Sequence, residues 1–361
     1  RQGADAVVVL IHQGGRTTGQ PDPNGCEGLN ADIRPILDRL DARVDLVVSG
    51  HTHWAYVCDY ARYNADKPFL LTSGGVWGSF VTDIALDIDP RAGRVVAKRA
   101  RNIAVQSAPY TGSRGTVAND ARFPVFEPRA DIAGYVATYV AAASDYAQRK
   151  VGWLAGPLDK SSGELQNAGG PLGALIADAQ LAATREAGAQ IAFMNPFGVR
   201  RSIAPGADGS VTFADIYAVQ PFNNDLLTQT YTGAELKEIL EQGLDANGPE
   251  QILTPSAGFA YDYDRSRPAG DRIVAMTLDG LPIDPARPYR VTASNFLASG
   301  GDSFATFAKG RDRTVGVTDI MALELWLKAT PPRGAPTDVR YRDVRPEFNR
   351  VRSTNPPGVK Y

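Results

Sequence analysis

The sequence predicts an α/β protein with two domains. The length of 361 residues exceeds what one hydrophobic core usually supports. Residues 6–11 and 44–49 are short apolar runs, which are typical of buried strands in a parallel sheet. Residues 33–40 lie between them and carry apolar side chains at three- and four-residue spacing, which predicts a helix.

Composition and charge exclude several classes of protein. With 43% hydrophobic and 22% charged residues, the chain has the composition of an ordinary globular protein. A net charge of −2 gives no reason to expect binding to a nucleic-acid polymer or to an anionic membrane. No apolar run approaches the length of about 18 residues that spans a bilayer, so no transmembrane segment is predicted.

All three histidines of the chain follow predicted strands. His12 ends the first apolar run, and His51 and His53 follow the second. Open α/β sheets bind ligands beyond the carboxyl ends of their strands, and in an extended chain residues i and i+2 point to the same side. A single histidine is usually a surface or packing residue, but three at strand ends favour a metal site, because neutral imidazole is a common metal ligand.

Residues 1–105 are expected to form the first domain. A loop rich in Gly, Pro and Asn, residues 13–30, follows the first strand. Further strands are predicted at residues 54–60, 68–72, 79–87 and 94–103, with a turn signal at residues 89–93. The small-residue loop at residues 73–78 leaves the sheet and is either an ordinary turn or part of the histidine site.

Residues 106–150 are expected to connect the domains. The first part is rich in Ser, Gly, Pro and Asn, which indicates a linker. From residue 128 onward, apolar side chains recur on one face, which predicts a bridging helix.

Residues 151–330 are expected to form a second, mixed α/β domain. The predicted strands are residues 151–154, 190–194, 226–231, 258–263, 272–278 and 289–294, and the predicted helices are residues 172–183, 213–219, 232–244 and 317–328. Thr232 and Glu235 have the spacing of a capping box, and Asp279 with Gly280 predicts a hairpin turn. The tail, residues 331–361, is rich in Arg and Pro and is expected to lie extended over the surface.

The two cysteines, Cys26 and Cys58, lie in segments beside the histidine site. They are either free thiols or a disulfide. Few Lys and many Gly, Pro, Asn and Thr favour an exported protein, and disulfides persist outside the cytoplasm. We therefore expect a disulfide and a secreted, periplasmic or cell-surface location.

Polar loops of the second domain contain residues that suit a phosphate and a nucleobase. Arginine suits bidentate binding of phosphate, a glycine lets backbone approach a ligand, and exposed aromatic rings stack on bases. A phenylalanine in a loop more often packs into a core, and an arginine often forms a surface ion pair. The candidates are Asn195, Gly198, Arg200, Phe222, Asn224, Phe296 and Asp302.

The Gly-His-Thr-His motif at residues 50–53 and the Ile-His-Gln-Gly-Gly motif at residues 11–15 resemble the distal half of a calcineurin-like metallophosphoesterase domain. That domain is a β-sandwich flanked by helices. In the family the upstream histidine and the first histidine of the later motif bind one metal of a two-metal centre, and the second histidine binds the other. The resemblance therefore implies His12, His51 and His53 as metal ligands.

The proximal half of that family carries Asp-x-His, Gly-Asp and Gly-Asn-His-Glu segments, which supply a bridging Asp, an Asn ligand and a catalytic His. None of these segments occurs in the chain, which begins at Arg1. We therefore expect an N-terminally truncated or proteolytically nicked product, or a sequence that contains only part of the protein. The catalytic residues stay unassigned, and we expect the residues present to be inactive without the missing N-terminal segment.

Three motifs resemble the 5′-nucleotidase C-terminal domain. They are Asn-Pro-Phe-Gly-Val-Arg at residues 195–200, Pro-Phe-Asn-Asn at residues 221–224 and Asn-Phe-Leu-Ala-Ser-Gly-Gly-Asp at residues 295–302. The resemblance implies that Phe222 and Phe296 stack on the base, that Asp302 holds the ribose, that Arg200 holds phosphate, and that Asn195 helps to bind the substrate. The segment Pro-Phe at residues 196–197 replaces the glycines usual in the family.

Together these resemblances imply metal-dependent hydrolysis of nucleotide phosphoesters, from nucleoside monophosphate to nucleoside and phosphate. The implied cofactors are two divalent metal ions, and histidine ligands favour Zn or Mn over Mg. One alternative is a 2′,3′-cyclic nucleotide phosphodiesterase or a pyrophosphatase of UDP-sugars or NAD. Another is a non-catalytic nucleotide-binding surface protein.

Overall fold

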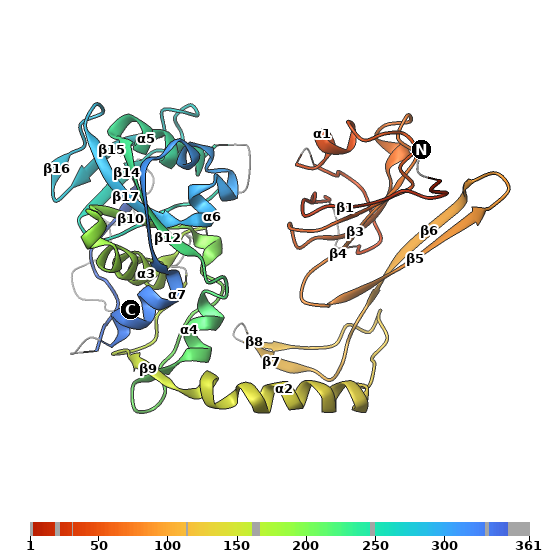
Figure 1. The fold of residues 1–361 in the computed structure, drawn as a ribbon, viewed down its shortest axis with the longest axis horizontal. Coiled ribbons are helices and arrows are strands. Elements are labelled where there is room, and N and C mark those ends of the chain that lie inside the picture. Colours follow the sequence, from red (N-terminus) through yellow and green to blue (C-terminus); the bar gives the residue numbers. More distant parts are fainter. Residues whose placement is uncertain are drawn as a thin grey trace. The chain divides into compact units, whose positions relative to one another are not determined.

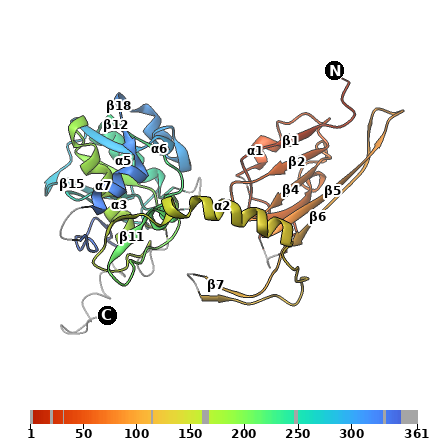
Figure 2. The same ribbon diagram turned by 60° about the horizontal axis from the view of Figure 1, so that its bottom comes forward.

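The structure is a computed structural model, and it describes residues 3–18, 22–30, 32–112, 115–160, 167–245, 250–328 and 332–345. The chain divides into two compact units, Arg1–Thr138 and Tyr139–Tyr361, which are described separately (Figures 1 and 2). Each unit combines sheets with helices, so the predicted α/β class is confirmed. Among the described residues, no helix has both the length and the apolar character needed to cross a membrane.

Unit 1 is built on a four-stranded sheet with the order β1-β2-β4-β3. Its elements are β1 (Val8–Leu10), α1 (Arg34–Leu37), β2 (Leu46–Ser49), β3 (Ala55–Asp59), η1 (Tyr60–Arg62) and β4 (Leu70–Gly74). The first three strands of the sheet are parallel, and β3 is antiparallel to β4. The predicted apolar runs therefore form adjacent parallel strands.

The core of unit 1 lies where the loop after β1 meets β3. Cys26 and Cys58, at 3% and 0% exposure, form a disulfide there with 5.0 Å between their Cα atoms. Of the two alternatives that the sequence left open, the structure contains the disulfide. The buried rings of Tyr56, Tyr60 and Phe69 pack in the same cluster.

Two hairpins and a long helix follow the sheet. They are β5 (Phe80–Asp89) with β6 (Arg94–Ala104), β7 (Tyr110–Gly112) with β8 (Gly115–Val117), and α2 (Ala130–Gln148). The predicted turn at residues 89–93 is confirmed, because the Gly93 N–H donates to the Asp89 carbonyl oxygen over 2.9 Å. Residues 106–128, which were predicted as a linker, contain the short hairpin of β7 and β8. The division between the two units falls within α2.

Unit 2 is built on a five-stranded sheet with the order β13-β10-β17-β12-β18. Its strands are β9 (Lys150–Trp153), β10 (Ile191–Met194), β11 (Ser210–Thr212), β12 (Asp225–Thr232), β13 (Thr254–Pro255), β14 (Phe259–Tyr263), β15 (Ile273–Leu278), β16 (Leu281–Pro282), β17 (Pro288–Ser294), β18 (Arg311–Thr318) and β19 (Tyr341–Asp343). Its helices are α3 (Gly170–Ala183), η2 (Arg185–Ala187), η3 (Pro196–Gly198), α4 (Phe213–Val219), α5 (Gly233–Gln242), α6 (Asn295–Ala298), η4 (Gly301–Ser303), η5 (Ala305–Lys309) and α7 (Asp319–Leu327).

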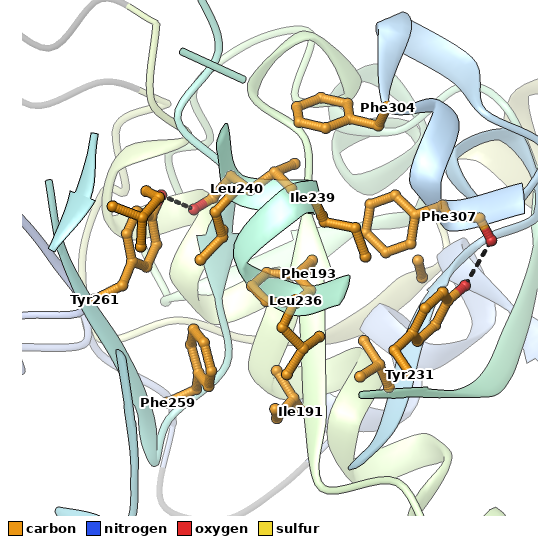
Figure 3. Packing of buried hydrophobic residues seen from close by; sticks show 14 of the residues in the cluster. Ile191, Phe193, Tyr231, Leu236, Ile239, Leu240, Phe259, Tyr261, Phe304 and Phe307 are labelled. Atoms are coloured by element: carbon orange, nitrogen blue, oxygen red, sulfur yellow. Dashed lines mark hydrogen bonds between the residues drawn. The ribbon is translucent and has the colours of Figure 1, made fainter. Parts of the chain in front are cut away.

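Strand β10 separates the hydrophobic clusters of unit 2. Successive side chains of a strand point to opposite faces. Ile191 and Phe193 accordingly join the cluster around α5 and β14, whereas Met194 joins the cluster around α3 and α7. Figure 3 shows the first cluster, in which side chains of α5 lie between Tyr261 and Phe307. The sheet is therefore covered on both faces.

The C-terminal part of unit 2 differs from the sequence predictions. Residues 311–316 had no predicted structure, but they form most of β18, an edge strand paired with β12. Strand β19 pairs in parallel with β14, so the tail does not simply lie over the surface there. Arg340, at 4% exposure, forms a bidentate ion pair with Asp178 of α3. Residues 346–361 of the predicted tail lie outside the described residues.

Two local sequence signals of unit 2 are confirmed. Asp279 and Gly280 have φ values of 51° and 77°, as the predicted hairpin turn requires. Thr232 and Glu235 form the capping box of α5, with each side chain accepting a hydrogen bond from the other residue's backbone N–H. The Glu235 carboxylate also forms an ion pair with Arg311 of β18, which joins the start of α5 to the edge strand.

This ion pair and capping box predict a pH-dependent stability. The Arg311 guanidinium is the largest cause that lowers the pKa of Glu235 from 4.5 to about 2. A carboxyl whose pKa is lowered by folding stabilises the folded state above its unfolded pKa, and this contribution is lost as pH falls through the folded pKa. Glu235→Gln should therefore lower the free energy of unfolding at pH 7 by about 1 kcal/mol.

Urea unfolding at several pH values measures this effect. The difference between wild type and Glu235→Gln should shrink as pH falls from 4.5 to about 2. The control Glu186→Gln changes an exposed carboxylate of η2 and should alter stability by less than about 0.5 kcal/mol. A pH-independent difference for Glu235→Gln would contradict the prediction.

Candidate functional site

The parallel strands of unit 1 bring two histidines together. β1 and β2 are neighbours that run in the same direction, so the segments carrying His12 and His51 leave the sheet at the same edge. His51 Nδ1 lies 3.2 Å from His12 Nε2, and the two ring centroids are 5.0 Å apart. Both side chains are exposed. The structure thus places these two predicted ligands with ring nitrogens facing each other.

His53 lies in a different arrangement from the one expected. His51 and His53 have φ values of 67° and 61°, so the expectation that this segment is extended is wrong. The His53 ring lies 6.5 Å from the ring of Trp77, which places the loop at residues 73–78 beside this histidine. Within the described ranges, no group of three or more His, Cys, Asp or Glu side chains is arranged to hold one metal ion.

In unit 2, the candidate segments meet at one edge of the sheet. β10 and β17 are adjacent and parallel, so residue 195 and residues 295–302 both follow carboxyl ends (Figure 1). β12 is antiparallel to β17, with Leu226 opposite Ser294, so the segment 222–224 enters the sheet at this same edge. The order of three strands therefore gathers parts of the chain that are far apart in sequence.

Asn195 and Asp302 form a direct hydrogen bond at this edge. The Asn195 side chain is 5% exposed, and its Nδ2 donates to Asp302 Oδ2 over 2.7 Å. Gly198 explains how Asn195 fits, since a Cβ at residue 198 would lie 2.6 Å from both Asn195 Oδ1 and the methyl carbon of Met194. The structure thus gives Gly198 a packing role, and the predicted approach of its backbone to a ligand stays a prediction.

Gly301, which precedes Asp302 in the chain, packs closely against Phe296. Phe296 lies in the one-turn helix α6, with 40% of its surface exposed. A Cβ at Gly301 would lie 2.6 Å from the Phe296 carbonyl oxygen and 2.7 Å from two of its ring carbons. Only glycine therefore allows this chain segment to pack under the Phe296 ring. The exposed ring consequently lies beside the segment that carries Asp302.

Arg200 and Phe222 form a second contact in unit 2. The Arg200 guanidinium carbon lies 5.4 Å from the centroid of the Phe222 ring, which is the geometry of a cation–π interaction. The guanidinium also donates to the Phe197 carbonyl oxygen over 3.1 Å. Phe222 is 45% exposed, so neither predicted aromatic residue is packed into the core. The structure brings these two predicted residues together.

Asn224 is half-buried and is held by Asp319, a residue that the sequence analysis missed. Asn224 Nδ2 donates to Asp319 Oδ2 over 3.0 Å, and the Asp319 N–H donates to the Asn224 carbonyl oxygen over 2.8 Å. Asp319 is 2% exposed, and this burial raises the pKa of its carboxyl group. No motif marked Asp319, because an acidic residue in the first turn of a helix is common. Binding of substrate by Asn224 stays a prediction.

Comparison with known proteins identifies the second unit. The family model described as "5'-nucleotidase, C-terminal domain" matches residues 150–309. Residues 150–309 form a 5′-nucleotidase C-terminal domain. The matched range contains all seven candidate residues, from Asn195 to Asp302. The resemblance predicted from the motifs of this domain is thus confirmed.

Similarity to relatives of this chain extends over both units. The trifunctional nucleotide phosphoesterase protein YfkN of Bacillus subtilis is 27% identical over 78% of this chain and 18% of its own length. The cell wall protein Lmo0130 of Listeria monocytogenes is 27% identical over 85% of this chain and 38% of its own. The crystal structure of a 5′-nucleotidase precursor from Thermus thermophilus superimposes with a TM-score of 0.56 at 26% identity, covering 84% of this chain and 60% of that one. The chain therefore spans less than two thirds of each of these proteins.

The tight contact at Gly301 predicts that this position accepts no side chain. Gly301→Ala should lower the free energy of unfolding by about 1–3 kcal/mol, because the new methyl group meets a backbone oxygen and an aromatic ring. Gly156→Ala is the matched control, since a Cβ there has no atom within 4 Å. Urea unfolding should show the loss for Gly301→Ala alone, and equal values for both variants would contradict the packing described.

Proposed function

We propose that the protein hydrolyses phosphoesters of nucleotides with the help of divalent metal ions. Unit 2 binds the nucleoside, and unit 1 holds the metal through its histidines. The observation that supports this most strongly is that three side chains lie together at one sheet edge: the exposed ring of Phe296, the carboxylate of Asp302 and the buried amide of Asn195. All three belong to the segment that matches the 5′-nucleotidase C-terminal domain.

The residues of unit 2 have separate roles in this proposal. Phe222 and Phe296 present exposed rings for the base, and stacking of this kind contributes on the order of 1–3 kcal/mol per base. The Asp302 carboxylate accepts hydrogen bonds from the ribose hydroxyl groups, and Asn195 orients that carboxylate. Arg200 binds the phosphate, because its guanidinium has five N–H donors, of which the contact with Phe197 uses one.

The histidines of unit 1 suit a transition metal. Two nitrogen ligands at about 2.1 Å from one ion lie about 3.0–3.4 Å apart for angles between octahedral and tetrahedral. The observed distance of 3.2 Å between His12 Nε2 and His51 Nδ1 falls within that range. Imidazole ligands favour Zn or Mn over Mg, and His53 is the proposed ligand of a second ion. A bound cation would supply a Lewis acid that stabilises negative charge on phosphoryl oxygens.

An extracytoplasmic location agrees with this function. The disulfide between Cys26 and Cys58 is of the kind that persists in oxidising compartments. One relative is named a cell wall protein. We therefore propose that the nucleotides hydrolysed are those outside the cytoplasm.

The metal role of the histidines predicts the behaviour of His51→Ala. Losing one of two facing ligands should weaken Zn²⁺ binding by at least about tenfold in isothermal titration calorimetry. In a full-length version of the protein, the variant should also abolish phosphate release from AMP in the presence of Zn²⁺ or Mn²⁺. Arg43→Ala, which changes an exposed side chain of the same unit, is the control and should change neither quantity. Unchanged metal affinity and turnover in His51→Ala would refute the role of this histidine.

Stacking on Phe296 predicts a selective effect on nucleotides. In a full-length version of the protein, Phe296→Ala should raise KM for AMP by about five- to 100-fold, as expected for the loss of one base–ring contact. It should leave KM for p-nitrophenyl phosphate nearly unchanged, since that ester has no base or ribose. Trp153→Ala removes another exposed aromatic ring of unit 2 and serves as the control. An equal rise for both substrates would argue against stacking.

A further inference from the structure

A buried glutamine contacts the segment that carries Asp302. Gln251 precedes β13 and is 4% exposed. Its side-chain Nε2 donates to the Asp302 carbonyl oxygen over 3.1 Å, and its backbone N–H donates to the Gly243 carbonyl oxygen over 2.7 Å. The amide orientation is determined by the first bond, because a flipped amide would place two oxygen atoms against each other.

The segment that Gln251 contacts has an unfavourable backbone conformation. Gly300, Asp302 and Ser303 have φ values of 90°, 54° and 70°. For residues with a side chain, such conformations cost on the order of 1–3 kcal/mol each and persist where the surroundings fix them. Asp302 is fixed at two points, since Gln251 binds its carbonyl oxygen and Asn195 binds its carboxylate.

Burying the glutamine side chain at this position has a free-energy cost. Its Oε1 atom is buried and has no hydrogen-bond partner within the described part of the chain. A buried acceptor without a partner costs on the order of 1–3 kcal/mol. An apolar side chain would avoid that cost if the position served only to fill the core. The bond to Asp302 is therefore the feature that distinguishes glutamine from an apolar residue here.

We propose that Gln251 is a positioning residue that gives the site its specificity for ribonucleosides. By fixing the backbone of Asp302, it directs the carboxylate toward the 2′- and 3′-hydroxyl groups of the ribose. An ionised carboxylate has about four acceptor positions, so the bond from Asn195 is compatible with two bonds from a diol. This inference rests on the proposed function, in which Asp302 binds the ribose.

The test compares nucleosides with and without the diol. Calorimetry with the whole chain should measure the affinity of adenosine and of 2′,3′-dideoxyadenosine for wild type and for Gln251→Met. Methionine keeps the length of the side chain and removes the donor. The variant should bind adenosine about tenfold more weakly, as for the loss of about 1.4 kcal/mol, while the affinity for dideoxyadenosine changes less than about twofold. The preference for the ribose should thus disappear.

Two further variants make the test specific. Gln251→Asn keeps a buried amide but is one methylene too short to reach Asp302. It should therefore also lose the preference for adenosine over dideoxyadenosine. This variant provides the test if Gln251→Met does not fold. Gln229→Met is the matched control, since Gln229 is 7% exposed and lies on β12, three register positions from the site edge. It should retain the preference of wild type.

The outcomes separate this inference from the proposed function. If wild type prefers adenosine and a folded Gln251 variant keeps that preference, the role of Gln251 is overturned while the proposed function stands. An equal loss of affinity for both nucleosides would also overturn it, because it would show a general structural effect. If wild type binds neither nucleoside, the proposed function and the inference both fail.

Discussion

The parallel pairing of β10 with β17 is the constraint on which the site in unit 2 depends. Two neighbouring parallel strands end at the same edge of a sheet, so Asn195 and Asp302 reach each other although 107 positions separate them. The antiparallel strand β12 begins at that edge and adds the segment with Phe222. Unit 1 repeats the principle with β1 and β2, whose parallel pairing brings His12 to His51. In both units, strand order brings the candidate side chains together.

Elements with a local physical signal were predictable from the sequence. The apolar runs that became β2 and β10 are buried, and the capping box of Thr232 and Glu235 acts within one turn of helix. The run that became β1 forms the predicted strand, but it lies at the edge of its sheet with Val8 and Leu10 exposed, so the expectation that it is buried is wrong. Strand β18 has no such signal, since most of its side chains are exposed and it is held by backbone pairing with β12. The place of β19 likewise depends on a partner strand about 80 residues earlier in the chain. Propensity and periodicity cannot reveal such long-range pairing.

Sequence motifs likewise predicted only some of the side-chain contacts in the candidate site. The motifs identified Asn195, Arg200, Phe222 and Asp302, and the structure joins them in two pairs. The backbone angles at His51 and His53 escaped prediction, because left-handed φ values are rare for residues other than glycine. The supporting residues Asp319 and Gln251 lie in no motif, and only the folded chain places them against Asn224 and Asp302.

The buried guanidinium of Arg340 joins a segment beyond the family match to the core of unit 2. It donates to the carbonyl oxygens of Ala174 and Pro255 as well as to Asp178. A shortened expression product ending at residue 309, where the family match stops, would lack this guanidinium together with β18 and α7. It would expose the apolar face of α3 and leave Asp178 without its counter-charge. We therefore expect the cooperative folding unit to extend beyond the matched family segment and to include Arg340 and β19.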